Sequence, residues 1–258
     1  KPDEPTYGFD KVIMLAGGVG YARRSDAQKG TPEPGEEVVL LGGDNYRIGM
    51  GGGAVSSVNT GQYAGAIELN AVQRSNPEMQ KRVENVIRTL SESEDNPIIS
   101  IHDHGAGGHL NCLSELVETT GGHFDLSAFP IGDETLSSKE IIGNESQERM
   151  GLLVKGDAVE RIARIAERER APMYVVGCTT DDMHLTFEEA GGDKPIDLAL
   201  SDMFGSAPKT YMVDKHIDKT YPALSYDAAR VEHYLDEVLQ QEGVACKDWL
   251  TNKVDRSV

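Results

Sequence analysis

The segment from 97 to 121 constrains the fold more than any other part of this chain, because three local signals follow one another without a gap. An apolar run over residues 97–101 leads to Asp103, small residues fill positions 105–108, and apolar residues then recur at helical spacing over 110–119. This order predicts a buried strand, a glycine turn and a helix. The start of such a helix exposes unpaired N–H groups at the positive end of the helix dipole, which suits an anion or a carboxylate-bound cation.

Short apolar runs alternate with amphipathic segments along most of the chain, as in a sheet covered by helices. By this pattern, strands are expected at 12–15, 38–41, 97–101, 152–155, 173–176, 183–187 and 196–200, and helices at 76–90, 110–119 and 157–166. Asn76 and Pro77 fit the start of the first helix, and Asp157 with Glu160 forms a candidate capping box for the third. The pattern predicts an α+β fold with three α/β/α layers and a mixed sheet.

The pattern changes after residue 213, which suggests two parts, 1–213 and 214–258. The second part contains one further amphipathic helix, expected over 231–239. The chain lacks an initiating Met and closes on 253–258, which resemble the beginning of a strand. We therefore expect it to be a piece of a longer protein.

Composition excludes several classes of function. With 258 residues, 38% of them hydrophobic, the chain can bury a sizeable core, and it has no stretch of 18 apolar residues that could span a membrane. Against 25 Lys and Arg stand 43 Asp and Glu, and the net charge of −18 repels nucleic acid and anionic lipid. The three cysteines show neither a disulfide framework nor a zinc spacing, which fits the cytoplasm. An anionic substrate would therefore need local basic groups or a metal.

The glycine-rich segment 49–54 formally matches the G-x-G-x-x-A dinucleotide fingerprint. No buried strand is expected before it and no good helix after it, so the match is weak. No G-x-x-x-x-G-K-[ST] sequence occurs, which excludes a P-loop. Gly51, Gly52 and Gly53 could equally form a mobile surface loop or tight chain crossing, or contact a ligand such as a phosphate.

Two polar residue types at the end of the strand at 97–101 suggest different chemistry. His102 and His104 form an H-x-H pair, which in a metal-dependent hydrolase would bind zinc or iron. Histidines of this kind are more often structural hydrogen-bonding residues. Asp103 between them could cap the helix or shape the turn, because Asp is common before glycines.

Several segments, taken together and in order, resemble the phosphoribosylformylglycinamidine synthase family of purine biosynthesis. They are IGMGGGAVSS (48–57), AVQRSNPEM (71–79), DNPIISIHDHGAGG (95–108), GNESQERM (143–150), ERERAP (167–172) and DRSV (255–258). HDHGAGG followed some forty residues later by NESQER is the most specific of these matches. The resemblance implies the carboxy-terminal lobe of the first of two related modules, the lobe shared with aminoimidazole ribonucleotide synthetase, followed by a connector from residue 214.

The resemblance also implies roles for individual residues. Gln73 and the triplet Glu145, Ser146 and Gln147 would contact the substrate, formylglycinamide ribonucleotide, and Asp103 would be a Mg²⁺ ligand. Mg²⁺ prefers hard oxygen ligands, and glutamine amides can donate and accept at once, so these roles are chemically reasonable. Arg74 or Arg149 could add positive charge for a phosphate, although either could be a solvated surface residue.

The family's catalytic histidine, most of its ATP site and its glutaminase triad are expected outside this chain. The resemblance therefore implies an ATP-dependent C–N ligase fragment with no catalytic residue of its own, inactive without the remaining domains and a glutaminase domain or subunit. Two other hypotheses stay open at this point. One is the metal-dependent hydrolase, and the other is a non-catalytic assembly domain that packs against partner lobes.

Overall fold

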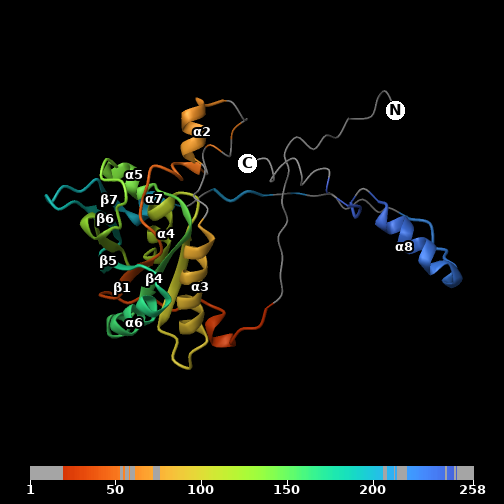
Figure 1. Cartoon of the computed structure of the whole chain (residues 1–258), viewed down its shortest axis with the longest axis horizontal. Helices are drawn as coiled ribbons and strands as arrows, with labels where there is room; N and C mark the ends of the chain where they lie inside the picture. The colour runs from red at the N-terminus through yellow and green to blue at the C-terminus, as the bar shows by residue number, and fades with distance from the viewer. Residues whose placement is uncertain are drawn as a thin grey trace. The chain divides into compact units, whose positions relative to one another are not determined.

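A computed structural model describes residues 20–52, 55, 58, 62–71, 76–205, 208–211, 213, 220–241, 243–246 and 248, with the backbone alone at 147. The chain divides into two compact units, Lys1–Ala207 and Pro208–Val258 (Figure 1). The expected strand at 12–15 lies outside the described residues. The predicted assignment of residues 214–258 as a connector stays a prediction.

The first unit contains seven strands and most of the helices in the described part of the chain. The strands are β1 (Glu37–Leu41), β2 (Ile98–His104), β3 (Gly122–Asp125), β4 (Ser146–Val154), β5 (Met173–Thr179), β6 (His184–Glu188) and β7 (Ile196–Ala199). The α-helices are α2 (Gly65–Ala71), α3 (Pro77–Ser91), α4 (Gly108–Leu116), α5 (Ser138–Ile142), α6 (Val159–Glu169) and α7 (Leu200–Phe204). Single 3₁₀ turns lie at Arg24–Asp26, Leu126–Ala128 and Gly156–Ala158.

All seven strands form one mixed sheet in the order β2-β4-β1-β5-β3-β6-β7. Neighbouring strands are antiparallel except for β3 and β6, which are parallel. Strand β1 lies inside the sheet between β4 and β5, and its residues Val38 to Leu41 are fully buried. The expected mixed sheet is thus confirmed.

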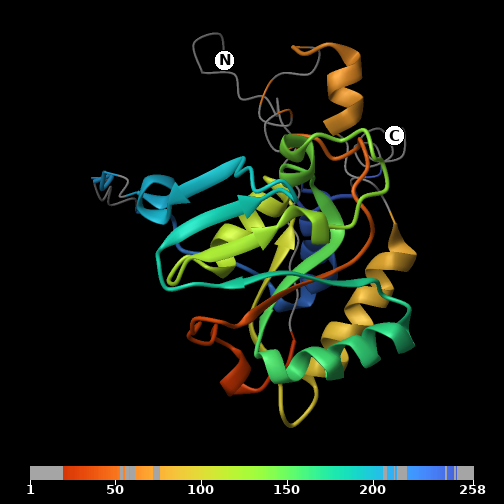
Figure 2. The same ribbon diagram turned by 90° about the vertical axis from the view of Figure 1, so that its left-hand side faces the viewer.

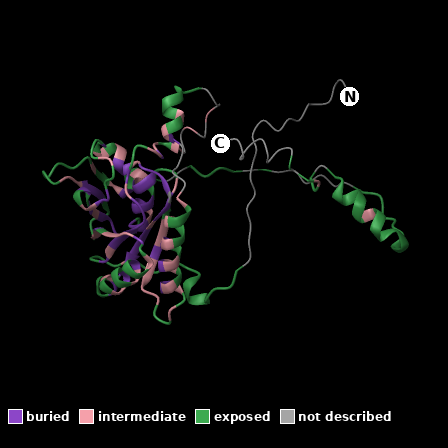
Figure 3. Cartoon of the chain, viewed as in Figure 1, coloured by how far each residue is buried: buried purple, intermediate pink, exposed green. Residues whose placement is uncertain are grey.

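Side chains of successive β1 residues point to opposite faces of the sheet, so each face has its own core. Val38 and Leu40 pack in a cluster that includes residues of α4 and α5, whereas Val39 and Leu41 pack with α3 and α6. Figure 2 shows α3 and α6 side by side on their face of the sheet, and Figure 3 shows the buried residues concentrated between the helices and the strands. The expected three-layer arrangement is confirmed.

Several local expectations are confirmed and others are wrong. Asn76 caps α3, its side chain accepting a hydrogen bond from the N–H of Met79, as expected. Helix α6 lacks the expected capping box, because the 3₁₀ turn Gly156–Ala158 leads directly into it. Helix α4 begins and ends earlier than expected. Strand β4 is longer, because the polar residues after Glu145 join the sheet.

The second unit contains α8 (Val231–Leu239), which follows a 3₁₀ turn at Ala228–Arg230. Asp227 caps this turn by accepting a hydrogen bond from the N–H of Ala229. Among the residues that the structure describes in the two units, no helix is long and apolar enough to cross a membrane.

Candidate functional site

The turn between β2 and α4 is organised by Asp103. This residue is exposed near the end of β2, and its Oδ1 accepts a hydrogen bond from the N–H of Gly105 over 2.7 Å. Such a bond, two residues on, is typical of an Asx turn. Asp103 therefore shapes the turn while its carboxylate stays accessible to solvent.

Glu145 brings this turn together with the GNESQERM segment. Its Oε1 accepts a hydrogen bond from the N–H of Gly107, the N-cap residue of α4, over 3.1 Å. The side chain is nearly inaccessible, with 3% of the residue exposed. The helix start that the sequence marked as an anion site thus holds a carboxylate of the chain itself, in the position that the helix dipole favours.

The glycine-rich loop also contacts Glu145. The carbonyl oxygen of Gly49 accepts a hydrogen bond from the N–H of Glu145 over 2.9 Å. A Cβ added to Gly52 would lie 2.6 Å from Oε2 of Glu145 and equally close to the carbonyl oxygen of Ala71. Gly52 therefore lies at a tight chain crossing, one of the alternatives left open for this loop. Gly51 has open space where its Cβ would be, and Gly53 lies outside the described residues.

Arg149 lies beneath this convergence and is 1% exposed, so it is not a solvated surface residue. Its Nε and Nη2 donate to the carbonyl oxygen of Gly43 over 3.2 and 3.1 Å, and Nη2 also donates to that of Asp44 over 3.3 Å. Nη1 donates to the carbonyl oxygen of Asn144 over 3.3 Å. The guanidinium therefore ties the chain after β1 to the turn before β4.

Comparison with known proteins covers this part of the chain. A family model described as "AIR synthase related protein, C-terminal domain" matches residues 33–189, which include both glycine turns and Glu145. The chain belongs to this family.

One relative of this AIR synthase related chain is phosphoribosylformylglycinamidine synthase of Homo sapiens. It is 38% identical over 276 residues, an alignment that covers 100% of the chain and 21% of the relative. The chain thus spans about a fifth of that relative's length.

Two solved structures from Thermotoga maritima share the fold. PurL complexed with FGAR matches with a TM-score of 0.65 and 24% identity, over 81% of this chain and 35% of that one. PurLQS matches with a TM-score of 0.60 and 22% identity, over 84% of this chain and 33% of that one.

Two histidines of the AIR synthase related domain lie in its interior next to Arg149. His104 and His109 are fully buried, with their rings edge to face and centroids 4.7 Å apart. Burial lowers the pKa of both imidazoles well below the usual value, and the positive charge of Arg149 lowers it further. Both rings are therefore neutral at pH 7, and Nε2 of His109 lies 3.1 Å from Nη1 of Arg149.

The remaining expected site residues of the domain differ in how much the structure says of them. Ser146 is 2% exposed and pairs with His104 across β4 and β2, and its hydroxyl has no hydrogen-bond partner among the described residues. The side chain of Gln147 is not described, and Gln73 and Arg74 lie outside the described residues. The structure thus brings together Asp103, Glu145 and Ser146, near the glycine loop.

The described residues give the hydrolase hypothesis no metal site. His102 Nδ1 lies 2.9 Å from Glu115 Oε2, and its Nε2 accepts a hydrogen bond from Lys29 Nζ over 2.5 Å. His104 is buried away from solvent. Within the part of the chain that the structure describes, no group of three or more His, Cys, Asp or Glu side chains is placed to hold a metal ion.

The sequence does not identify Arg149 as the residue that ties the chain after β1 to the turn before β4. The sequence allows Arg149 to be a phosphate ligand, whereas the structure shows it buried and bound to backbone carbonyls. The sequence does contain a local signal for the start of α5, the helix just before Asn144, because Ser137 and Glu140 form a capping box.

Proposed function

We propose that this chain is the substrate- and magnesium-binding lobe of an enzyme that makes formylglycinamidine ribonucleotide from formylglycinamide ribonucleotide, ATP and glutamine. The observation that carries the proposal is the meeting of three separate glycine and acidic motifs at Glu145, in a chain 38% identical over its whole length to human phosphoribosylformylglycinamidine synthase. PurL of Thermotoga maritima has been solved with FGAR and with ATP, which supports these two ligands. The proposal places the chain in purine biosynthesis in the cytoplasm.

Asp103 is the proposed magnesium ligand. Mg²⁺ is commonly bound by one or two carboxylates together with water and substrate phosphates, so a single exposed carboxylate beside a glycine turn fits this ion. When bound, Mg²⁺ would neutralise charge on the ATP phosphates. The hydrogen bond that Asp103 accepts from the N–H of Gly105 fixes the carboxylate in position before Mg²⁺ binds.

The segment Glu145 to Gln147, together with Gln73, is the proposed substrate site. Glu145 and Ser146 are buried among the described residues, and the glycine-rich loop that packs on Glu145 is a further proposed contact of the substrate phosphate. The Ser146 hydroxyl lacks a partner among the described residues and can donate to a ligand amide or phosphate. The buried Arg149 is committed to backbone carbonyls, so positive charge for the substrate phosphate must come from Arg74 or another basic residue.

The remaining steps are assigned to other parts of the parent enzyme. These parts would supply the catalytic histidine, most of the ATP site and ammonia from a glutaminase domain or subunit, a partner that the likeness to PurLQS of Thermotoga maritima also supports. The isolated chain is expected to be inactive.

Calorimetric titration of formylglycinamide ribonucleotide into the complete enzyme tests the proposal. The Glu145→Gln variant keeps the shape of the side chain and removes its charge, so substrate affinity should fall about tenfold or more. Unchanged affinity in this variant would remove Glu145 from the substrate site. A coupled ADP assay should detect no substrate-dependent turnover by the isolated chain, and turnover there would contradict the fragment interpretation.

A further inference from the structure

The side chain of Asn144 holds the segment that precedes the glycine-rich loop. Its Nδ2 donates to the carbonyl oxygens of Tyr46 and Ile48 over 2.7 and 2.9 Å. Asn144 is 2% exposed, and its backbone forms a β-bridge with Met50. Both amide hydrogens are thus directed at one short stretch of chain, which no aliphatic or acidic side chain could reproduce.

The other face of the Asn144 amide is fixed as well. Its Oδ1 lies 3.5 Å from both Nη1 and Nη2 of Arg149. The buried guanidinium therefore selects the orientation in which the oxygen faces Arg149 and the amino group faces the loop. The orientation of Asn144 follows from the charge beneath it.

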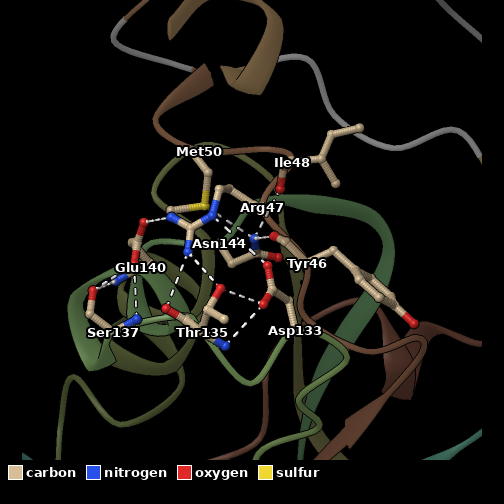
Figure 4. Close-up of polar contacts among 9 residues, drawn as sticks. All are labelled: Tyr46, Arg47, Ile48, Met50, Asp133, Thr135, Ser137, Glu140 and Asn144. Carbon is tan, nitrogen blue, oxygen red and sulfur yellow. Dashed lines mark hydrogen bonds and ion pairs between the residues drawn. The ribbon is translucent and has the colours of Figure 1, made fainter. Parts of the chain in front are cut away.

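Arg47 anchors the same segment from the outer side. Its Nη1 forms an ion pair with Glu140, Nη2 donates to the carbonyl oxygen and to Oγ1 of Thr135 over 3.2 Å each, and Nε lies 3.9 Å from Asp133. Figure 4 shows these groups around the guanidinium, with Asn144 facing the same segment at Tyr46 and Ile48. The partners of Arg47 are themselves fixed, since Glu140 belongs to the capping box of α5 and Asp133 accepts from Thr135.

We infer that Asn144 and Arg47 are positioning residues that clamp residues 46–50 and thereby set the Glu145 carboxylate in its place. The clamped segment ends at Gly49 and Met50, and Gly49 accepts the hydrogen bond from the N–H of Glu145. Gly52, three residues on, packs against the other end of the Glu145 side chain. A shift of the segment would therefore move both contacts of Glu145 at once.

The kinetic part of this inference rests on the proposed function, whereas the clamp itself does not. Two arms of one experiment separate them. The first measures hydrogen exchange of the backbone amides of 46–52 in the purified chain. The second measures the KM for formylglycinamide ribonucleotide and kcat in the complete enzyme.

Asn144→Asp is the most informative variant, because it has the same shape and gains a favourable charge beside Arg149. It loses both donors and turns a carboxylate oxygen toward two carbonyl oxygens. Exchange in 46–52 should become about tenfold faster, the change expected when local opening becomes about 1.4 kcal/mol easier. The KM for the ribonucleotide should rise about tenfold with a much smaller change in kcat, as for a loss of uniform binding.

Asn85→Asp is the matched control. Asn85 also donates through Nδ2 to an acceptor on another element, Glu169 on α6, over 3.1 Å, at a distance from the clamp. It should lower overall stability without selectively faster exchange in 46–52 and without a change in KM.

The Arg47 variants test the outer side of the clamp. Arg47 is half-exposed, so its substitution should leave the fold intact. Arg47→Lys keeps the charge and loses the fork of the guanidinium, so exchange in 46–52 should rise less than in Arg47→Ala.

Three results would overturn the inference. They are unchanged exchange in 46–52 for the Asn144 and Arg47 variants, an equal increase in the Asn85 control, and faster exchange with an unchanged KM while Glu145→Gln raises the KM. If Glu145→Gln itself leaves the KM unchanged, the proposed substrate site fails, and the exchange arm alone then decides whether the clamp exists.

Discussion

The N–H of Gly107 donates to Oε1 of Glu145 over 3.1 Å, and this bond joins two motifs that are 38 residues apart in the sequence. A carboxylate at the start of a helix is favoured by about 0.3–1 kcal/mol through the helix dipole. The same carboxylate packs on Gly52 from the glycine-rich loop. Glu145 is therefore the residue through which the two glycine turns and the start of β4 act as one unit.

Gly52→Ala should disturb this unit directly. The new Cβ would lie 2.6 Å from both Oε2 of Glu145 and the carbonyl oxygen of Ala71, and the backbone atom cannot move aside easily. Overpacking of this kind costs about 1–3 kcal/mol, and urea denaturation of the chain would measure it. Gly191→Ala is the control, because nothing lies within 4 Å of its Cβ position. Equal stability of the two variants would show that the loop relaxes freely around Glu145.

Arg149→Lys should be far from conservative. Lysine keeps the buried charge but cannot reach the carbonyl oxygens of Gly43, Asp44 and Asn144 together. Buried carbonyl groups left without donors cost about 1–3 kcal/mol each, so the free energy of unfolding should fall by at least about 2 kcal/mol. Thermal melts would measure the loss, with the exposed Arg164→Lys as a control. A melting temperature equal to that of the control would mean that Arg149 contributes little to the turn.

The architecture could be predicted because its signals are local and periodic. Burial of Val38 to Leu41 and the cap at Asn76 follow from the sequence pattern and side-chain chemistry within a few residues. Strand β3 and the polar start of β4 were missed, because a short strand next to glycines and a polar strand have no clear period. Both segments become strands because they pair with distant parts of the chain, which a local sequence pattern does not show.

Much less of the site could be predicted from the sequence. The family resemblance identified Asp103 and Glu145, but only the fold shows that Asp103 is exposed and Glu145 is 3% exposed. Asn144 and Arg149 act through backbone carbonyls of segments about 100 residues away in the sequence, and carbonyl partners leave no trace in side-chain patterns. Such contacts require the three-dimensional structure.

Stability should fall at acidic pH because of His104 and His109. Their pKa values are lowered in the folded chain by burial and by Arg149, whereas the unfolded value is about 6.5. Above about pH 6.5 both states are neutral, and below it the unfolded state binds protons that the folded state does not, which costs up to about 1.4 kcal/mol per pH unit for each histidine. Urea unfolding at pH 7.5 and 5.5 should show a smaller loss for His104→Gln than for the unmodified chain. Equal losses would assign the acid sensitivity to carboxylates instead.

Asp103 offers a test that separates its turn role from its proposed metal role. Asp103→Asn preserves the acceptor for the N–H of Gly105 and removes the negative charge, whereas Asp103→Ala removes both. In the complete enzyme, Asp103→Asn should lower ATP turnover at least about tenfold and raise the Mg²⁺ concentration needed for half-maximal rate, because the ion loses a hard anionic ligand. The melting temperature of the chain should stay close to that of the parent for Asn and fall for Ala, because only Ala loses the turn bond. Near-normal turnover and Mg²⁺ dependence in Asp103→Asn, with a lower melting temperature in Asp103→Ala, would make Asp103 a turn residue and place the magnesium ligands elsewhere.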